Sequence, residues 1–273
     1  MSQAGTIGAA GGGGEGNEIT LTANTGSATS VSHILNVLGV GGISTNASGN
    51  TLNIVSTESF TPNSQLQEFD DFLRSENKLD WVEAGVFSEI DGLLGHPGLL
   101  GFQTGAGSQS LTLGDNATGN PIALGGGQLS INFVIDLDAL SNVTDSYTFY
   151  VGLSDWTSTQ NTVPPINGVF ISYTNSVNAG SYVLNSTNSS TTTSVNSSVI
   201  ATTGFVNYGI VVNASGTSIS YFINGTLVAG GPITTNIPTA AISPFFMIIS
   251  NTGNTPSGSI DLFYINLNLT TPR

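Results

Sequence analysis

The feature that most restricts the fold of this chain is a long series of short β-prone runs separated by turn residues, with no helical pattern between them. Apolar and polar residues alternate clearly in "GVFISY" and "SISYFI", which is the pattern of strands with one buried face. Many strands at this spacing predict an all-β protein folded as an antiparallel sandwich. In chain order the runs are "LLGFQT", "LSINFVIDL", "YTFYVGLS", "GVFISYT", "FVNYGIVVN", "TSISYFI", "PFFMIISN" and "IDLFYINLNL".

Two further patterns predict where particular strands lie. "YFINGTLVA" places Asn224-Gly225 between two β-prone runs, and this pair favours a hairpin because a type I′ turn needs positive φ at both central residues. The stretch "NSTNSSTTTSVNSS", residues 185–198, has low complexity. It is predicted to be a loop or a polar edge strand rather than a separate linker.

The stretch "NSQLQEFDDFLRSENKLDW" precedes these runs and allows two interpretations. Its apolar residues have a spacing that suits one face of a short helix, and they are Leu66, Phe69, Phe72 and Leu73. The same residues fit an extended lead-in strand equally well. Trp81, at the end of the stretch, is predicted to belong to the first core strand.

The amino-terminal part differs in composition from the rest. Residues 1–19 are rich in Gly and Ala, and glycine loses the most backbone entropy on ordering, so we expect a flexible arm. Residues 20–57 hold short β-prone pieces, 34–38 and 51–55, between Gly and Asn turns. Such a small β-module buries little by itself and needs a neighbour or an oligomer. Residues 58–273 are assigned to the sandwich.

Charge restricts the partners of the chain. Only 7% of its 273 residues are charged, and 17 acidic against three basic residues give a net charge of −14. A phosphate backbone would be repelled, which argues against nucleic-acid binding. Ser, Thr, Asn and Gly have to supply the surface polarity instead, which is typical of extracellular or virion β-proteins. Because there is no cysteine, the fold depends on packing rather than on disulfides.

No targeting segment is recognisable in the sequence. "MSQAGTIGAAGGGGEG" has neither the positively charged region nor the apolar core of a signal peptide, and no apolar run approaches the ~20 residues of a membrane span. We therefore expect a protein made in a cytoplasm, without a secretion signal and without membrane insertion.

One stretch, "FSEIDGLLGHPG", resembles half of a glycosidase active site. The β-jelly-roll endoglucanases carry Glu-x-Asp-x-x-Glu on one strand, and a retaining mechanism needs two carboxyl groups ~5–5.5 Å apart. Glu89 and Asp91 fit the first half, but Leu94 stands where the second glutamate is required. Gly92 and Gly95 interrupt the strand that would align the pair. We therefore predict no catalysis at this stretch.

The two histidines give no sign of a triad or of a metal site. A Ser-His-Asp arrangement would have to use His33 or His96, and no G-x-S-x-G motif surrounds any serine. Each histidine stands alone in the sequence and is interpreted as a surface or packing residue. We therefore predict that the chain is not an enzyme and needs no cofactor.

Calcium is the one metal that the sequence leaves open. Oxygen-rich segments could supply carboxylate and carbonyl ligands. They are "LGDNATGN", with Asp115 and Asn116, and "DLDALSNVTD", with Asp136, Asp138 and Asp145. Neither matches a defined calcium-loop pattern, so structural turns are favoured and a structural calcium ion stays the alternative.

Three residues are candidates for binding a sugar. Trp156 follows Asp155 in "GLSDWTSTQN", at the end of a predicted strand and in a polar loop without an obvious core partner for the ring. An exposed aromatic face next to a carboxylate acceptor suits a pyranose. Tyr182 is a third candidate contact. The alternative is that Trp156 folds back to cap the end of the sandwich.

Residues 21–56 resemble a short Gly/Ser-rich β-module found near the amino ends of many tailed-bacteriophage virion proteins. That module is typically written around N-I-x-x-x-G-x-G-I-x-T-x-G-x-G-N-T-L-T-I. The residues that fit it are Asn36, Gly39, Gly41, Gly42, Ile43, Thr45, Gly49, Asn50, Thr51, Leu52 and Ile54.

The larger part of the chain resembles the concanavalin-like jelly-roll module that follows in phage tail and fibre proteins. The segments that carry this resemblance are "EFDDF", "GHPGLLGFQTG", "GVFISYT", "IVVNASGTSISYFINGTLVA", "IPT" and "IDLFYINLNLT". Together the two resemblances cover residues 20–273. They imply a jelly-roll fold, a place in the virion and a homotrimer, since fibres usually have threefold symmetry.

The expected function is that of a tail fibre or receptor-binding protein of a tailed phage. Residues 1–57 would attach it to other virion proteins, and loops at the free end of the sandwich would bind a host surface polysaccharide without cleaving it. One alternative is a purely architectural capsid or tail decoration protein. Another is a depolymerising tailspike, for which Glu83 and Glu89 are the first carboxylates to test.

Overall fold

The computed structural model describes residues 20–23, 26–29, 43–48, 51–56, 65–72, 81–102, 109–113, 121–156, 165–253 and 256–270. The chain divides into two compact units, Met1–Thr61 and Pro62–Arg273, and this division falls close to the boundary predicted between the β-module and the sandwich. The predicted arm, residues 1–19, and His33 lie outside the described residues. In the described part of the chain, no helix is long and apolar enough to cross a membrane.

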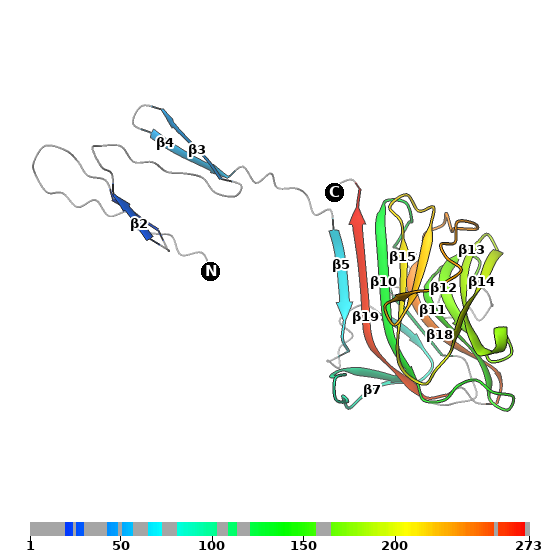
Figure 1. Cartoon of the computed structure of the whole chain (residues 1–273). Coiled ribbons are helices and arrows are strands. Elements are labelled where there is room, and N and C mark those ends of the chain that lie inside the picture. Colours follow the sequence, from blue (N-terminus) through cyan, green and yellow to red (C-terminus); the bar gives the residue numbers. More distant parts are fainter. Residues whose placement is uncertain are drawn as a thin grey trace, which may run out of the picture. The chain divides into compact units, whose positions relative to one another are not determined.

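The first unit contains two separate antiparallel strand pairs (Figure 1). β1 (Thr20–Ala23) pairs with β2 (Gly26–Thr29), and β3 (Ile43–Ser48) pairs with β4 (Thr51–Ser56). The predicted β-prone piece 51–55 lies within β4, whereas the piece 34–38 lies outside the described residues.

The second unit is a sandwich of two antiparallel sheets (Figure 1). In the order of paired neighbours, the eight-stranded sheet holds β17 (Thr226–Leu227), β16 (Ile219–Ile223), β15 (Gly204–Val212), β10 (Gly127–Leu137), β19 (Gly258–Leu269), β8 (Leu99–Phe102) and β7 (Phe87–Ile90), with β5 (Gln65–Asp70) also paired to β19. The seven-stranded sheet holds β14 (Thr191–Ile200), β13 (Ser181–Asn188), β12 (Gly168–Tyr173), β11 (Ser146–Ser154), β18 (Ser243–Thr252), β9 (Gln109–Leu113) and β6 (Trp81–Ala84). A short 3₁₀ helix, η1 (Asn178–Gly180), precedes β13. This arrangement confirms the predicted all-β class and the antiparallel sandwich.

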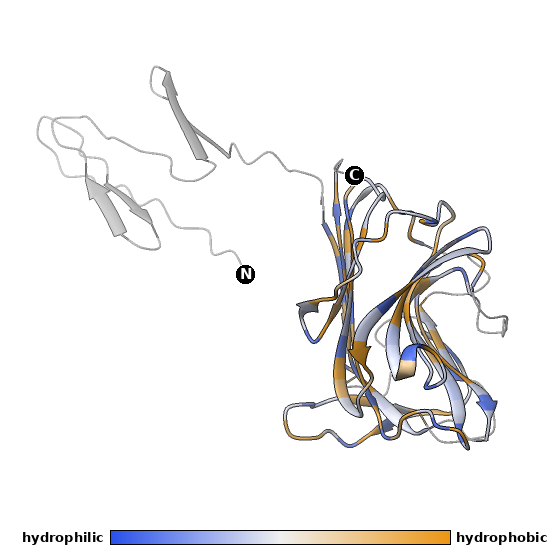
Figure 2. Cartoon of the chain, turned by 45° about the vertical axis from the view of Figure 1, so that its right-hand side comes forward, coloured by the Kyte–Doolittle hydropathy of each residue, from blue (hydrophilic) through white to orange (hydrophobic). Residues whose placement is uncertain are grey.

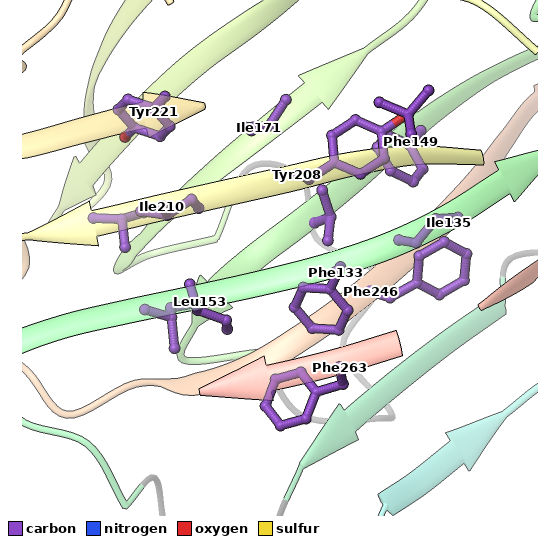
Figure 3. Close-up of a cluster of buried hydrophobic side chains, with 14 of the residues drawn as sticks. Phe133, Ile135, Phe149, Leu153, Ile171, Tyr208, Ile210, Tyr221, Phe246 and Phe263 are labelled. Atoms are coloured by element: carbon purple, nitrogen blue, oxygen red, sulfur yellow. The ribbon is translucent and has the colours of Figure 1, made fainter. Parts of the chain in front are cut away.

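Alternation along the strands explains why the two sheets pack on each other. In β10, every second residue from Leu129 to Leu137 is at most 1% exposed, and the residues between them are more exposed. Figure 2 shows this alternation of hydrophobic and hydrophilic residues along the strands. The buried rings of the two sheets meet between them, with the centroids of Phe149 on β11 and Tyr208 on β15 5.2 Å apart (Figure 3). The sandwich core is therefore built from the alternating residues that the sequence pattern predicts.

Residues 65–70 of the stretch before Trp81 form the extended strand β5, so the helical interpretation is wrong for Leu66 and Phe69. β5 pairs antiparallel with the end of β19, and its residues alternate in exposure along most of its length. This pairing satisfies the backbone groups of a segment too short to form a stable helix by itself. Trp81 lies on a core strand as predicted, and it is 7% exposed. Its Nε1 donates a hydrogen bond of 3.0 Å to Oδ2 of the buried Asp70.

Hairpins form at the predicted Asn224-Gly225 turn and in the low-complexity tract 185–198. Asn224 (φ 50°) and Gly225 (φ 73°) join β16 to β17, and their two positive φ angles are those that a type I′ turn requires. The polar tract 185–198 belongs to β13 and β14, which pair antiparallel on either side of Ser189 and Ser190. Because β14 is the last strand of its sheet, the prediction of a polar edge strand is confirmed for residues 191–198, whereas residues 185–188 belong to the inner strand β13.

Replacing Gly225 with alanine is expected to lower the free energy of unfolding by about 1–2 kcal/mol, because alanine is disfavoured in the left-handed region. An added Cβ meets no atom within 4 Å at Gly225 or at Gly126, and only Gly225 has a positive φ. Gly126→Ala is therefore the matched control, and it should leave the free energy of unfolding unchanged or raise it. Urea unfolding curves measure both values. Equal losses in the two variants would contradict the type I′ turn.

Candidate functional site

Two connections, from β11 to β12 and from β13 to β14, meet at one end of the seven-stranded sheet and are joined by hydrogen bonds. Asp155 directly follows β11, Asn167 directly precedes β12, and Ser189 lies in the turn between β13 and β14. Asn167 donates to Asp155 twice, from its backbone N to Oδ1 at 3.0 Å and from Nδ2 to Oδ2 at 2.8 Å. The backbone N of Ser189 donates to Oδ1 of Asn167 at 3.0 Å. We call this group, Asp155, Asn167 and Ser189, the Asp155 corner.

The Asp155 corner retains hydrogen-bonding capacity. An ionised carboxylate has about four acceptor positions, and the contacts with Asn167 occupy one at each oxygen. The Asp155 side chain is half-buried, while Asn167 is buried and fixed on both sides. The carboxylate is therefore held in one orientation and can still accept hydrogen bonds from hydroxyl groups.

Trp156 lies beside this corner in sequence, but its ring is buried. It is 1% exposed and packs in a second hydrophobic cluster with Tyr150, Phe170, Phe245 and Met247, which we call the outer cluster. These four side chains alternate along β11, β12 and β18 with those of the main core, so they lie on the opposite, outer face of the seven-stranded sheet. The prediction that Trp156 is an exposed platform is therefore wrong. Its ring folds back, as in the alternative, but onto the outer face of the seven-stranded sheet rather than over the end of the sandwich.

Tyr182 is also buried, and it lies apart from the Asp155 corner. The side chain is 1% exposed and belongs to the main core, where its hydroxyl lies 3.0 Å from that of Tyr208. Burial raises the pKa of Tyr182 and also that of Tyr208. Tyr182 lies near the start of β13, whereas Ser189 of the corner follows the end of that strand. The structure therefore corrects Tyr182 from a candidate sugar contact to a core residue.

A set of polar side chains that the sequence analysis did not identify lies next to the outer cluster. Asn185 is opposite Phe170 in the pairing of β12 and β13, so both point to the outer face. Asn185 donates from Nδ2 to Ser172 Oγ at 2.9 Å and accepts at Oδ1 from Ser194 Oγ at 2.7 Å. The hydroxyl oxygens of Thr187 and Thr192 lie 2.9 Å apart. We call Ser172, Asn185, Thr187, Thr192 and Ser194 the polar ladder, and all but Ser172 belong to the low-complexity tract 185–198.

The strand that carries Glu89 ends before the position of the missing glutamate, as the sequence predicts. Glu89 is exposed on β7, which ends at Ile90. Leu93 and His96 close a turn by two backbone hydrogen bonds of 2.8 and 2.9 Å. Within this turn Gly95 has φ 87°, and Leu94, at the position of the missing glutamate, is fully exposed. No strand continues to align a second carboxyl group with Glu89.

His96 packs against the outer face of the eight-stranded sheet. Its Nδ1 lies 2.6 Å from Oδ2 of Asp261, and its ring stacks on Phe205 at a centroid distance of 3.7 Å. These contacts tie the turn after β7 to β19 and β15. They agree with the interpretation of His96 as a packing residue.

Asp136, Asp138 and Asp145, the acidic residues considered for calcium that the structure describes, do not gather into one site. Asp138 accepts a hydrogen bond of 2.5 Å from Ser257 Oγ, and burial raises the pKa of Asp136, with a further contribution from Asp138. Among the side chains that the structure describes, no group of three or more His, Cys, Asp or Glu residues could hold a metal ion. Asp115 and Asn116 lie outside the described residues.

No protein-family model matches the sequence, and no curated protein matches it. Solved structures match the fold. The carbohydrate recognition domain of Emp47p aligns with a TM-score of 0.51 and 12% identity over 76% of this chain and 96% of that domain. The corresponding domain of Emp46p, in a potassium-bound form, aligns with a TM-score of 0.50 and 10% identity over 72% of this chain and 94% of that domain. The carbohydrate esterase vb_24B_21 of the Shiga toxin-encoding bacteriophage phi24B aligns with a TM-score of 0.45 and 14% identity over 69% of this chain and 90% of that protein.

The comparison shows the fold of the second unit. At these identities, the likeness to the Emp47p and Emp46p domains shows a concanavalin-like, lectin-type jelly roll and nothing more specific. The predicted jelly-roll sandwich is therefore confirmed.

Proposed function

We propose that this chain is a structural virion protein of a tailed phage, of the tail fibre or receptor-binding type, and that it binds a host surface polysaccharide without cleaving it. The observation that carries the binding function is the Asp155 corner, a carboxylate held in place by Asn167 at the end of the seven-stranded sheet. The virion role and the homotrimer rest on the resemblance of the chain to phage β-modules and jelly rolls. The Emp47p and Emp46p domains, with a similar fold, are carbohydrate recognition domains.

The chemistry of the corner suits a sugar that carries many hydroxyl groups. Each hydroxyl can donate a hydrogen bond to an Asp155 oxygen, and such charge-assisted bonds are stronger than those between neutral groups. The net charge of −14 would repel an acidic polysaccharide, so a neutral one is the better partner. Several copies on one virion would add their weak contacts by avidity.

Two features support binding without cleavage. Glu89 has no second carboxylate on its strand, and the corner itself contains one carboxylate group. A retaining or inverting glycosidase needs a pair of them. We therefore assign Asp155 to binding and no residue to catalysis.

Replacing Asp155 with asparagine is expected to weaken binding of neutral host polysaccharide by about tenfold or more, because a hydrogen bond to a charged group contributes about 1.5–3 kcal/mol. Calorimetry of the full chain with purified polysaccharide measures the affinity, and chromatography of the same samples measures polymer size, which should not change. Asp145→Asn is the matched control, because Asp145 precedes the opposite end of β11.

Each other outcome has a defined meaning. Equal affinity in both variants would place the sugar on another surface. If the wild-type chain binds none of the polysaccharides tested, the architectural role is favoured. A decrease in polymer size would reveal an enzyme, and Glu83 and Glu89 would then be replaced first.

A further inference from the structure

The edge strands of the sandwich differ in how they are protected against pairing with another chain. Unpaired backbone groups at a sheet edge can pair with a further strand, and proteins discourage this with charges or very short strands. Among the described edge strands, β5, β6 and β7 carry Glu68, Glu83 and Glu89. β17 is two residues long. Four of the five edges thus have a feature that opposes pairing.

β14 is the edge that lacks both forms of protection. Its ten residues, "TTTSVNSSVI", include no charged residue, no proline and no glycine. Pairing with β13 is regular from Thr191 to Asn196, and beyond this point the register shifts and Ser198 has φ 58°. A bulge of this kind protects an edge, so the open part of β14 is the regular segment from Thr191 to Asn196.

Exposed apolar side chains lie at both ends of β14. Ile166, 51% exposed, accepts a hydrogen bond at its backbone O from the N of Ser190, directly before β14. Ile200, 65% exposed, is the last residue of the strand. Val177, 43% exposed, lies next to η1, which contacts β14. The open edge is therefore flanked by apolar surface that a partner could cover.

We propose that two copies of the chain pair antiparallel, edge to edge, through Thr191–Asn196 of β14. A second copy is the fitting partner because β14 is neutral in a chain of net charge −14, so this contact brings no acidic strand residues together. An antiparallel pairing of one strand with itself is isologous and closes at two copies.

This pairing joins the two seven-stranded sheets into one continuous sheet. The two Asp155 corners then belong to one assembly and can bind the same polymer, a consequence that rests on the proposed function, whereas the pairing itself does not. Any threefold symmetry in the amino-terminal region would be a separate contact, and the twofold pairing would then join two trimers. The number of chains in the wild-type assembly is therefore even.

The test is the mass of the full chain in sedimentation equilibrium, with Ser194→Glu as the first variant. A twofold axis at Ser194 would place this residue opposite its own copy, so the two introduced carboxylates would lie directly across from each other, and we expect the association constant to fall at least tenfold. Thr191→Glu, at an exposed position, is a second variant in case the first one fails to fold. Thr226→Glu, on the exposed β17, is the matched control and should associate like the wild type.

Hydrogen exchange provides an independent measurement. In the wild type, half of the amides of residues 191–196 face the open edge, and they should become protected as the concentration of the chain rises. The proposal is overturned by a wild-type mass that is not an even multiple of the mass of one chain. It is also overturned if the association constant is unchanged in both folded variants, or if it falls equally in Thr226→Glu. None of these measurements depends on polysaccharide binding, so a failure of the pairing proposal can be distinguished from a failure of the proposed function.

Discussion

Replacing Trp156 with alanine is expected to lower the free energy of unfolding by about 3–5 kcal/mol, as for other large aromatic side chains in cores. The ring is 1% exposed and meets Tyr150 and Phe245 edge-on, at centroid distances of 5.3 and 5.2 Å. Its removal leaves a cavity on the outer face of the seven-stranded sheet, and the hydrogen-bonded strands below cannot close it. Urea unfolding at constant temperature measures the change.

Val143→Ala is the matched control, because Val143 is 92% exposed and its truncation should change the free energy by less than about 0.5 kcal/mol. Polysaccharide binding by folded Trp156→Ala distinguishes the two roles considered for this residue. If the variant kept wild-type stability and lost binding, Trp156 would be a sugar platform in solution. A large loss of stability would assign it to the outer cluster.

The sequence predicted those parts of the fold that depend on neighbouring residues. The alternation of β10 and the Asn224-Gly225 turn are local signals, and the structure confirms both. The strand before Trp81 was ambiguous, because β5 is extended by its pairing with β19, at the other end of the chain. A window of local sequence does not contain that partner.

The burial of Trp156 and Tyr182 could not be predicted for a related reason. Trp156 follows a strand whose two faces are both buried, one against the main core and one in the outer cluster. Its ring contacts Phe245 and shares the outer cluster with Phe170, and both residues reach it only through the pairing of β12 and β18 with β11. By contrast, the position of Asp155 at the end of a strand was predicted, since a strand end depends on local sequence.

Tyrosine burial leads to a strong dependence of stability on alkaline pH. Burial raises the pKa of six of the seven tyrosines, which are Tyr147, Tyr150, Tyr173, Tyr182, Tyr208 and Tyr221. For Tyr150 the pKa rises to about 12. Few other groups titrate in this range, because the chain has no cysteine and Lys78 is its one lysine.

Raising the pH above 10 is expected to reduce the free energy of unfolding by up to about 8 kcal/mol per pH unit. An unfolded tyrosine loses its proton near pH 10, whereas these six keep theirs in the folded state. The unfolded chain then binds fewer protons, and each tyrosine contributes a decrease of about 1.4 kcal/mol per pH unit. The stabilisation is complete below pH 10 and is lost as the pH rises through the folded pKa values. Because domains have about 5–15 kcal/mol of stability, unfolding should occur within one or two pH units above 10.

Tyrosinate absorbance and circular dichroism, recorded on the same samples, test this expectation. The six tyrosines should ionise together in the same transition in which the sheet signal is lost. Tyr150→Phe removes one titrating group and should decrease the slope by about 1.4 kcal/mol per pH unit, whereas Tyr264→Phe is the control for the change of side chain. Ionisation of these tyrosines one by one near pH 10, with the sheet signal intact, would contradict the burial of their hydroxyl groups.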